Sequence, residues 1–173
     1  MGEARRVGTV QVWYVSYGSN MSRARLDCYL RGGRPDGGAR TYVGARDPRG
    51  PAARIAVRLP GTVYFAGESR VWGGGRAFYD PDLPGDTAAC AYLLGGEQFV
   101  DIHAQEPPCY DRILDVGVRG DVPRCTFTAA VGRVAVVGAA PSAAYLAAMA
   151  TGLREVFGWS SDQAQAHLRR LAR

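Results

Sequence analysis

The fold of this chain is decided by a stretch near its start, VQVWYVSYGSNMS, at residues 10–22. Residues 10–16 alternate and are rich in Val, Trp and Tyr, which predicts a β-strand. Ser22 is a favourable N-cap and no Gly or Pro follows until Gly32, so we expect a helix that reaches about Leu30. The glycine-containing turn between this strand and this helix would direct several backbone N–H groups and the positive end of the helix to one point. The stretch is therefore suited to hold an anion or a polarised carbonyl group.

Asn20 lies beside the glycine of this turn and is the only asparagine among the 173 residues. All 21 basic residues are arginines, so the composition is strongly biased. In such a chain, an asparagine here suggests that its amide, or its tolerance of left-handed backbone, is needed. An ordinary turn residue is the alternative that local sequence leaves open.

The length and hydropathy of the chain bound its class. At 173 residues it is long enough to bury a core, and we expect one domain over residues 1–173 with residues 1–8 flexible. The start has no signal-peptide pattern, and no run approaches the roughly 18 apolar residues of a membrane span. We therefore expect a soluble cytoplasmic protein with no membrane partner.

Charge and cysteine usage exclude further classes. The net charge is +5, but the arginines are scattered along the chain and form no dense block. Nucleic-acid binding usually needs clustered charge and a recognisable module, so we expect no nucleic-acid partner. The four cysteines are far apart and form no C-x-x-C pair. Neither a disulfide framework nor a metal site is expected.

The remaining pattern predicts strands in the middle of the chain and helices around them. Strands are expected over residues 40–45, 54–59, 62–67, 71–79, 88–94, 110–118 and 124–130, with 131–137 as a further candidate. Helices are expected over residues 97–105, 142–157 and 160–172, the last with a capping box of Ser160 and Gln163. This order predicts an α+β fold. A sheet of six or seven short strands that contains a triple glycine is expected to curl toward a small barrel.

The triple glycine lies in Trp72-Gly73-Gly74-Gly75, inside an expected strand. Glycines weaken a strand, so their presence predicts that another group approaches the backbone closely. We expect Gly74 to border a substrate-binding site. A bulge or a barrel corner is the alternative.

Glu106 is the carboxylate that we expect to do chemistry. It follows Gln105 at the end of an amphipathic helix and precedes two prolines. The helix dipole disfavours a negative charge at this end, and apolar neighbours raise a carboxyl pKa, so Glu106 would be poised as a base. A solvated surface acid is the alternative for such a position.

Several segments together resemble the γ-glutamyl cyclotransferase-like family. They are Tyr-Gly-Ser-Asn-Met at residues 17–21, Trp-Gly-Gly-Gly-x-Ala at 72–77 and Gln-Glu at 105–106. Residues 106–112 are also similar to the family's Glu-x-x-x-Tyr-x-Arg segment. These landmarks span roughly residues 12–112. Their order and spacing carry the resemblance, because no single one of them is specific.

The resemblance implies a small mixed β-barrel flanked by helices. It also implies an activity, the release of a γ-glutamyl group as 5-oxoproline, with Glu106 as the catalytic carboxylate. The implied substrate-binding loop consists of Tyr17, Gly18, Ser19, Asn20 and Met21. Pro107-Pro108 depart from the small, flexible residue that is commoner in the family, which leaves the amine half of the substrate open.

The residue types fit this chemistry independently. The substrate's α-amine must attack its own side-chain amide, and a carboxylate such as Glu106 can take the amine's proton and pass it to the departing amine. Backbone N–H groups at residues 18–20 can hold the substrate carboxylate or the developing oxyanion. Since the nucleophile belongs to the substrate, fixing its folded conformer supplies much of the acceleration. The mechanism requires neither a metal nor a cofactor.

Four further residues are candidates for the same site. Glu68 could bind the substrate ammonium or assist Glu106, or be a turn acid paired with a nearby arginine. Tyr110 and Arg112 could orient Glu106 or contact the substrate, and we count Tyr110 and Glu68 among the substrate-binding residues. His103, one turn before Glu106, is expected to pack or to support the site residues and not to be catalytic.

We therefore expect an enzyme that acts on a small-molecule γ-glutamyl amide as a monomer or homodimer. The alternatives are an amide hydrolase that uses the same carboxylate and a non-catalytic binding protein on the same fold. The enzyme hypothesis requires Glu106 to meet Gly18 and Asn20 in one hollow, although they lie about ninety positions apart.

Overall fold

The structure, a computed structural model, describes residues 10–172, which form an α+β fold. The expected flexible segment, residues 1–8, lies outside this range. The strands are β1 (Gln11–Ser16), β2 (Ala53–Pro60), β3 (Thr62–Ala66), β4 (Arg76–Asp80), β5 (Asp86–Gly95), β6 (Arg112–Arg119) and β7 (Val122–Thr128). The helices are α1 (Arg23–Arg31), α2 (Gly96–Ala104), α3 (Ala143–Phe157) and α4 (Ser161–Leu171), with short 3-10 helices η1 (Ser19–Met21) and η2 (Arg133–Ala135).

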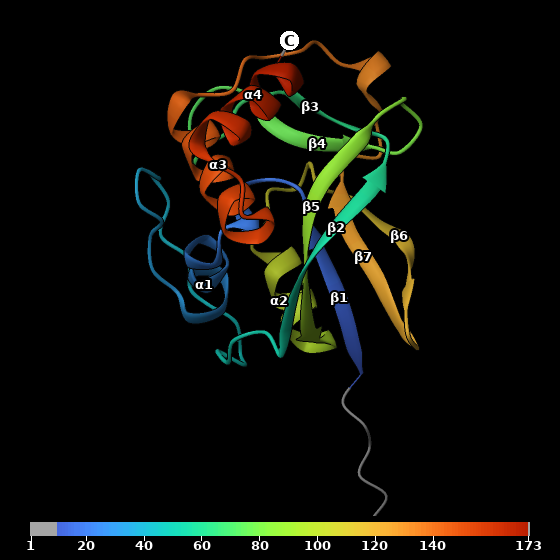
Figure 1. The fold of residues 1–173 in the computed structure, drawn as a ribbon. Coiled ribbons are helices and arrows are strands. Elements are labelled where there is room, and N and C mark those ends of the chain that lie inside the picture. The colour runs from blue at the N-terminus through green and yellow to red at the C-terminus, as the bar shows by residue number, and fades with distance from the viewer. Residues whose placement is uncertain (1–9, 173) are drawn as a thin grey trace, which may run out of the picture.

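The predicted opening strand, β1, lies at the centre of the main sheet, whose order is β2-β5-β1-β7-β6 (Figure 1). It pairs antiparallel with β5 and parallel with β7. Residues 12–15 are all buried, because elements cover both faces of a central strand. On one face the Phe99 ring of α2 meets the Tyr14 ring edge-on. The loop that follows β1 therefore emerges in the interior of the protein.

The seven strands confirm the expected number and the α+β class, but they do not close into a barrel. Strand pairing among residues 10–172 gives the five-stranded sheet and a separate β3–β4 hairpin (Figure 1). The separation occurs at Gly61, whose positive φ of 96° turns the chain out of β2 and away from the main sheet. A hairpin across one end of the sheet thus replaces the expected barrel wall.

Three predicted strands differ from the structure. Residues 40–45 form one isolated bridge, between Tyr42 and Gly33, and no strand. Residues 131–137 contain only η2. The expected strand 71–79 begins at Arg76, because residues 71–75 turn sharply. The predicted capping box of Ser160 and Gln163 at the start of α4 is confirmed.

The triple glycine does permit a close backbone approach, and the approaching group is the chain itself. A Cβ at Gly74 would lie 2.6 Å from the carbonyl oxygen of Ala140 and 2.9 Å from the backbone nitrogen of Ser142. Gly75 donates its N–H to the same carbonyl of Ala140. The segment before α3 is thereby fixed against the hairpin.

None of the helices in the described range combines the length and apolarity needed to cross a bilayer.

Helix α3 packs directly against η1, the turn that follows β1. Ser22 occupies the N-cap position of α1 as expected, but its hydroxyl donates to Glu155 of α3 instead of capping the helix. The Glu155 carboxylate accepts the backbone N–H of Arg23 at 3.0 Å, so α3 supplies the cap. The closest approach is at Gly152, where a Cβ would lie 2.5 Å from Met21 Cβ.

We predict that Gly152→Ala lowers the free energy of unfolding by about 1–3 kcal/mol, because the new methyl group would overpack the contact with η1. Without that contact, Ala would stabilise a helix by about 1 kcal/mol relative to Gly. Thr151→Ala, on the exposed side of α3, is the control and is expected to be neutral or slightly stabilising. Urea unfolding followed by circular dichroism measures both. Equal stability of the two variants would contradict the close packing.

Candidate active site

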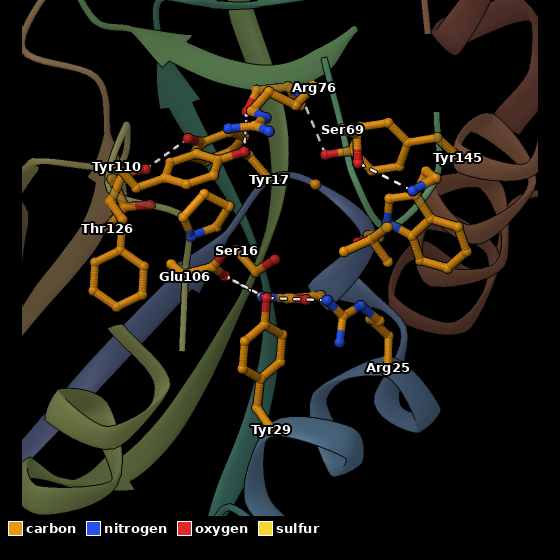
Figure 2. Close-up of a pocket in the computed structure, with 18 of the residues that line it drawn as sticks. Ser16, Tyr17, Arg25, Tyr29, Ser69, Arg76, Glu106, Tyr110, Thr126 and Tyr145 are labelled. Atoms are coloured by element: carbon orange, nitrogen blue, oxygen red, sulfur yellow. Dashed lines mark hydrogen bonds between the residues drawn. The ribbon is translucent and has the colours of Figure 1, made fainter. Parts of the chain in front are cut away.

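A pocket of about 60 Å³ opens where the loop after β1 meets the segment after α2 (Figure 2). Its walls also include residues of α1, Tyr145 of α3 and the side chains of Ser69, Val71 and Trp72. The predicted residues that line it are Tyr17, Gly18, Ser19, Asn20, Glu106 and Tyr110. The fold therefore brings the two predicted segments together in one cavity.

Asn20 and Glu106 touch across the pocket. The Asn20 amide Nδ2 lies 3.2 Å from Glu106 Oε1 and 3.0 Å from the Tyr14 hydroxyl. Asn20 is buried, and no non-glycine residue among 10–172 has a positive φ. The asparagine thus serves through its side-chain amide, and left-handed backbone is not what the position needs.

Tyr29 makes the second contact with the carboxylate. Its hydroxyl donates to Glu106 Oε1 at 2.7 Å and accepts from Arg25 Nη2 at 3.0 Å. Burial raises the pKa of the Tyr29 hydroxyl well above its ordinary value, so it stays protonated and acts as a donor. Arg25 also donates to the Tyr42 hydroxyl at 2.6 Å.

Arg25 and Tyr29 were not predicted from the sequence as site residues. The available signal was their i, i+4 spacing on α1, which places a charge and an aromatic ring on the same helix face as the buried Leu26 and Leu30. A charged residue on a buried helix face usually needs a partner. Here the two residues form one side of the pocket.

Burial raises the pKa of the Glu106 carboxyl above its ordinary value. The hydrogen bond from Tyr29, the positive charge of Arg25 and the hydrogen bond from Asn20 act in the opposite direction and favour the ionised form. The raised pKa agrees with the sequence-based expectation, although the main cause is burial. Both hydrogen bonds end on Oε1, and no group among residues 10–172 donates to Oε2.

Gln105 positions its neighbour. The side-chain amide donates to the backbone carbonyls of Tyr29 and Asp101 at 3.0 and 3.1 Å, and its oxygen accepts from Gly44 N–H. The residue is buried and caps α2, which ends at Ala104, one residue earlier than expected. Gln105 thus ties the end of α2 to α1, and Glu106 is carried to the pocket by this anchor.

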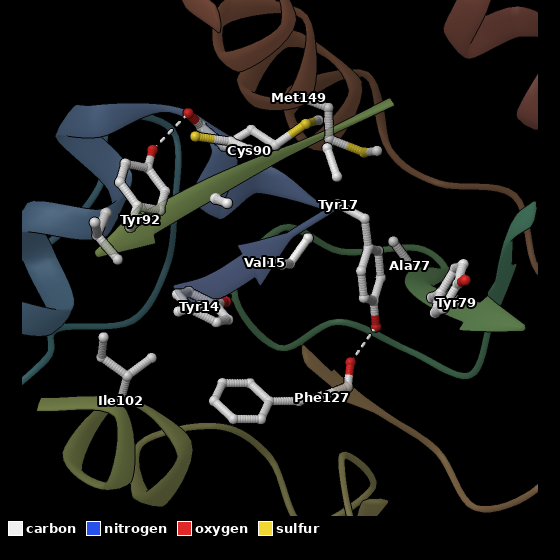
Figure 3. Close-up of a cluster of buried hydrophobic side chains, with 14 of the residues drawn as sticks. Tyr14, Val15, Tyr17, Ala77, Tyr79, Cys90, Tyr92, Ile102, Phe127 and Met149 are labelled. Atoms are coloured by element: carbon white, nitrogen blue, oxygen red, sulfur yellow. Dashed lines mark hydrogen bonds between the residues drawn. The ribbon is translucent and has the colours of Figure 1, made fainter. Parts of the chain in front are cut away.

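The tyrosines of the predicted site form walls. The Tyr17 hydroxyl donates to the Phe127 carbonyl at 2.6 Å (Figure 3), and the Tyr110 hydroxyl donates to the Ala77 carbonyl at 2.7 Å. Their protons are therefore engaged by backbone acceptors. His103 stacks on the Phe127 ring with centroids 4.5 Å apart, which agrees with the packing role expected for it.

Other predicted residues lie outside the lining. Met21 is buried in the core, and its carbonyl accepts from Tyr92 and from Arg54. Gly74 packs against the segment before α3, as described above. The side chains of Glu68 and Arg112 are exposed.

No cluster of three or more His, Cys, Asp or Glu side chains that could hold a metal ion occurs within residues 10–172. The titratable groups of the pocket are instead a carboxylate, two arginines and several tyrosines. This set can bind a charged organic molecule and move a proton.

Comparisons with known proteins establish the fold. No family model matches the chain. Histone deacetylase 5 of Arabidopsis thaliana is 42% identical over 101 residues, which are 56% of this chain and 15% of that protein. The chain therefore spans about a seventh of the length of this curated relative.

Three solved structures are similar over nearly the whole chain. An uncharacterized protein from Homo sapiens has a TM-score of 0.64 at 16% identity and covers 90% of this chain and 87% of its own. A gamma-glutamyl cyclotransferase has a TM-score of 0.63 at 14% identity with the same coverage. YkqA from Bacillus subtilis has a TM-score of 0.61 at 20% identity, with 94% of this chain and 56% of that chain covered. The chain has the γ-glutamyl cyclotransferase-like fold.

We predict that Tyr29→Phe raises the pKa of the Glu106 carboxyl further, because the variant loses the hydrogen bond that stabilises the carboxylate. Tyr42→Phe is the matched control, since it removes a hydroxyl that contacts Arg25 but not Glu106. Carbon-13 NMR titration of labelled glutamate carboxyls, assigned with Glu106→Gln, measures both. A Tyr29→Phe titration that coincides with wild type would show that this bond does not act on Glu106.

Proposed function

We propose that this protein is a γ-glutamyl cyclotransferase-like enzyme that releases 5-oxoproline from the amide of a small amine or peptide. The observation that carries the proposal is the meeting of Glu106 and Asn20, at 3.2 Å, beside the backbone of the loop that follows β1. The γ-glutamyl cyclotransferase-like fold supports it.

Glu106 would act as the base and then as the acid. The substrate's α-ammonium gives one proton to Oε2, and the resulting free amine attacks the γ-carbonyl carbon of the same molecule. A C–N bond closes the lactam ring, and the original amide C–N bond breaks. The proton on Glu106 and the second proton of the attacking nitrogen pass to the departing nitrogen, which leaves as an ammonium. Burial shifts the pKa of the Glu106 carboxyl toward neutral pH, and a group whose pKa lies nearer to the working pH can both take and return a proton.

The loop after β1 would stabilise the oxyanion. Among the described residues, nothing accepts a hydrogen bond from the backbone N–H groups of Gly18, Ser19 or Asn20. All three residues line the pocket. Free backbone N–H donors at a pocket wall can stabilise a developing negative charge on oxygen.

The reaction product separates this proposal from the alternatives. If Glu106 activated water instead of the α-amine, the same pocket would hydrolyse the amide and release free glutamate. A binding protein on this fold would retain the compound unchanged. Mass spectrometry of the products from a panel of γ-glutamyl amides distinguishes the three.

We predict that Glu106→Gln lowers the rate of 5-oxoproline release by about 10²- to 10⁴-fold, the range typical of losing a general acid–base. Glu97→Gln, which changes an exposed glutamate in the first turn of α2, is the matched control and is expected to retain full activity. Unchanged turnover in Glu106→Gln would refute the role given to this residue.

The same substitution should change stability with pH. A carboxyl pKa that is higher in the folded than in the unfolded protein means that the folded form binds the proton more tightly. Glu106 therefore costs stability as pH rises above the ordinary value of 4.5 and through the folded pKa. We expect Glu106→Gln to have the higher Tm at pH 7, and the difference to vanish below about pH 4. A lower Tm at pH 7 would mean that the carboxylate stabilises the fold.

A further inference from the structure

Arg25 is a buried cation without an anion. Its guanidinium carbon lies 4.3 Å from the ring centroids of both Tyr29 and Tyr42, which pack against each other, and the residue is only 4% exposed. Nη2 donates to both tyrosine hydroxyls. Nε and Nη1 are buried and have no partner among residues 10–172, and Arg25 belongs to none of the ion pairs in that range.

This situation is unusual for a buried arginine. Buried charges are normally paired and fully hydrogen-bonded, because a desolvated charge and unsatisfied N–H groups are both unfavourable. Arg54, which is only partly buried, has a carboxylate partner in Glu155 at 2.8 Å. Arg76, the other arginine of the pocket, donates to the Glu68 carbonyl and the Cys109 sulfur. Of these three arginines, Arg25 is the one whose guanidinium has buried N–H groups without a partner among residues 10–172, and an anion from outside the chain would satisfy them.

The position of Arg25 indicates where that anion belongs. Arg25 lines the same pocket as Glu106, and a single hydroxyl links the two: Arg25 to Tyr29 at 3.0 Å and Tyr29 to Glu106 at 2.7 Å (Figure 2). A carboxylate and a guanidinium this close together are complementary to a molecule that carries an ammonium and a carboxylate on neighbouring atoms. An α-amino acid headgroup is such a molecule.

We infer that Arg25 binds the α-carboxylate of the substrate while Glu106 binds the α-amine, so that the pocket selects amides with a free α-amino acid headgroup. This inference rests on the proposed function, and it divides the anionic groups of the substrate between two sites. The α-carboxylate pairs with Arg25. The backbone N–H groups of Gly18, Ser19 and Asn20 are left for the oxyanion.

A matched pair of substrates tests this assignment. A γ-glutamyl amide and the 4-aminobutyryl amide of the same amine both close a five-membered lactam, and they differ only in the α-carboxylate. We expect wild type to prefer the γ-glutamyl amide by at least about 10²-fold in kcat/KM, because a site built around a charged partner rejects the analogue that lacks it. Equal kcat/KM values for the two amides would overturn the inference.

Substitution of Arg25 locates the preference. Arg25→Met should reduce the preference for the γ-glutamyl amide over the 4-aminobutyryl amide to within about tenfold, by lowering kcat/KM for the γ-glutamyl amide alone. Arg25→Lys should restore part of this preference. A purely structural role would lower kcat/KM for both substrates equally. A folded Arg25→Met protein that keeps the full preference would overturn the inference.

Equilibrium binding separates this inference from the proposed function. By calorimetry, wild type should bind 5-oxoproline at least about tenfold more tightly than 2-pyrrolidinone, the same lactam without its carboxylate, and Arg25→Met should lose the difference. If this holds but no γ-glutamyl amide is turned over, the proposed function fails and the carboxylate site stands. If γ-glutamyl amides are turned over but wild type binds both lactams equally, the function stands and the site fails. The wild-type comparison requires no variant, so it remains decisive if Arg25→Met does not fold.

Discussion

The hydrogen bonds that end on Glu106 Oε1 are the interactions on which the site depends. Burial makes a charged carboxylate unfavourable, and the Tyr29 hydroxyl and the Asn20 amide offset part of that penalty. The two donors come from α1 and from the turn after β1, so the carboxylate is oriented only when both elements are in place. A carboxyl held in this balance retains a raised pKa while remaining able to ionise.

The tertiary structure brings the turn after β1, helix α1 and the segment after α2 together at the pocket. β1 lies in the middle of the main sheet, so the turn that follows it is delivered to the interior. Gln105 fastens the end of α2 to the backbone of α1, and Glu155 of α3 caps the start of α1. α3 closes over η1 at Gly152, where no Cβ fits. Each contact joins segments that are distant in sequence, which is why the pocket is a product of the whole tertiary structure.

The parts of the site that could be predicted are those with a recognisable local sequence pattern. The strand, the glycine turn and the acid before two prolines each have a local signature, and the α+β class follows from element order. Arg25 and Tyr29 carry no such signature, because their partners are supplied by tertiary contacts. The barrel was predicted wrongly because a triple glycine indicates a close approach without identifying the approaching group. Here that group is the backbone of Ala140.

A crystal structure of the protein with 5-oxoproline tests the central claim most directly. We expect the lactam nitrogen to lie about 3 Å from Glu106 Oε2, with the ring carbonyl directed at the backbone N–H groups of residues 18–20. We also expect the carboxylate of the product to contact Arg25. A lactam bound elsewhere, or a Glu106 side chain turned out to solvent, would contradict the account.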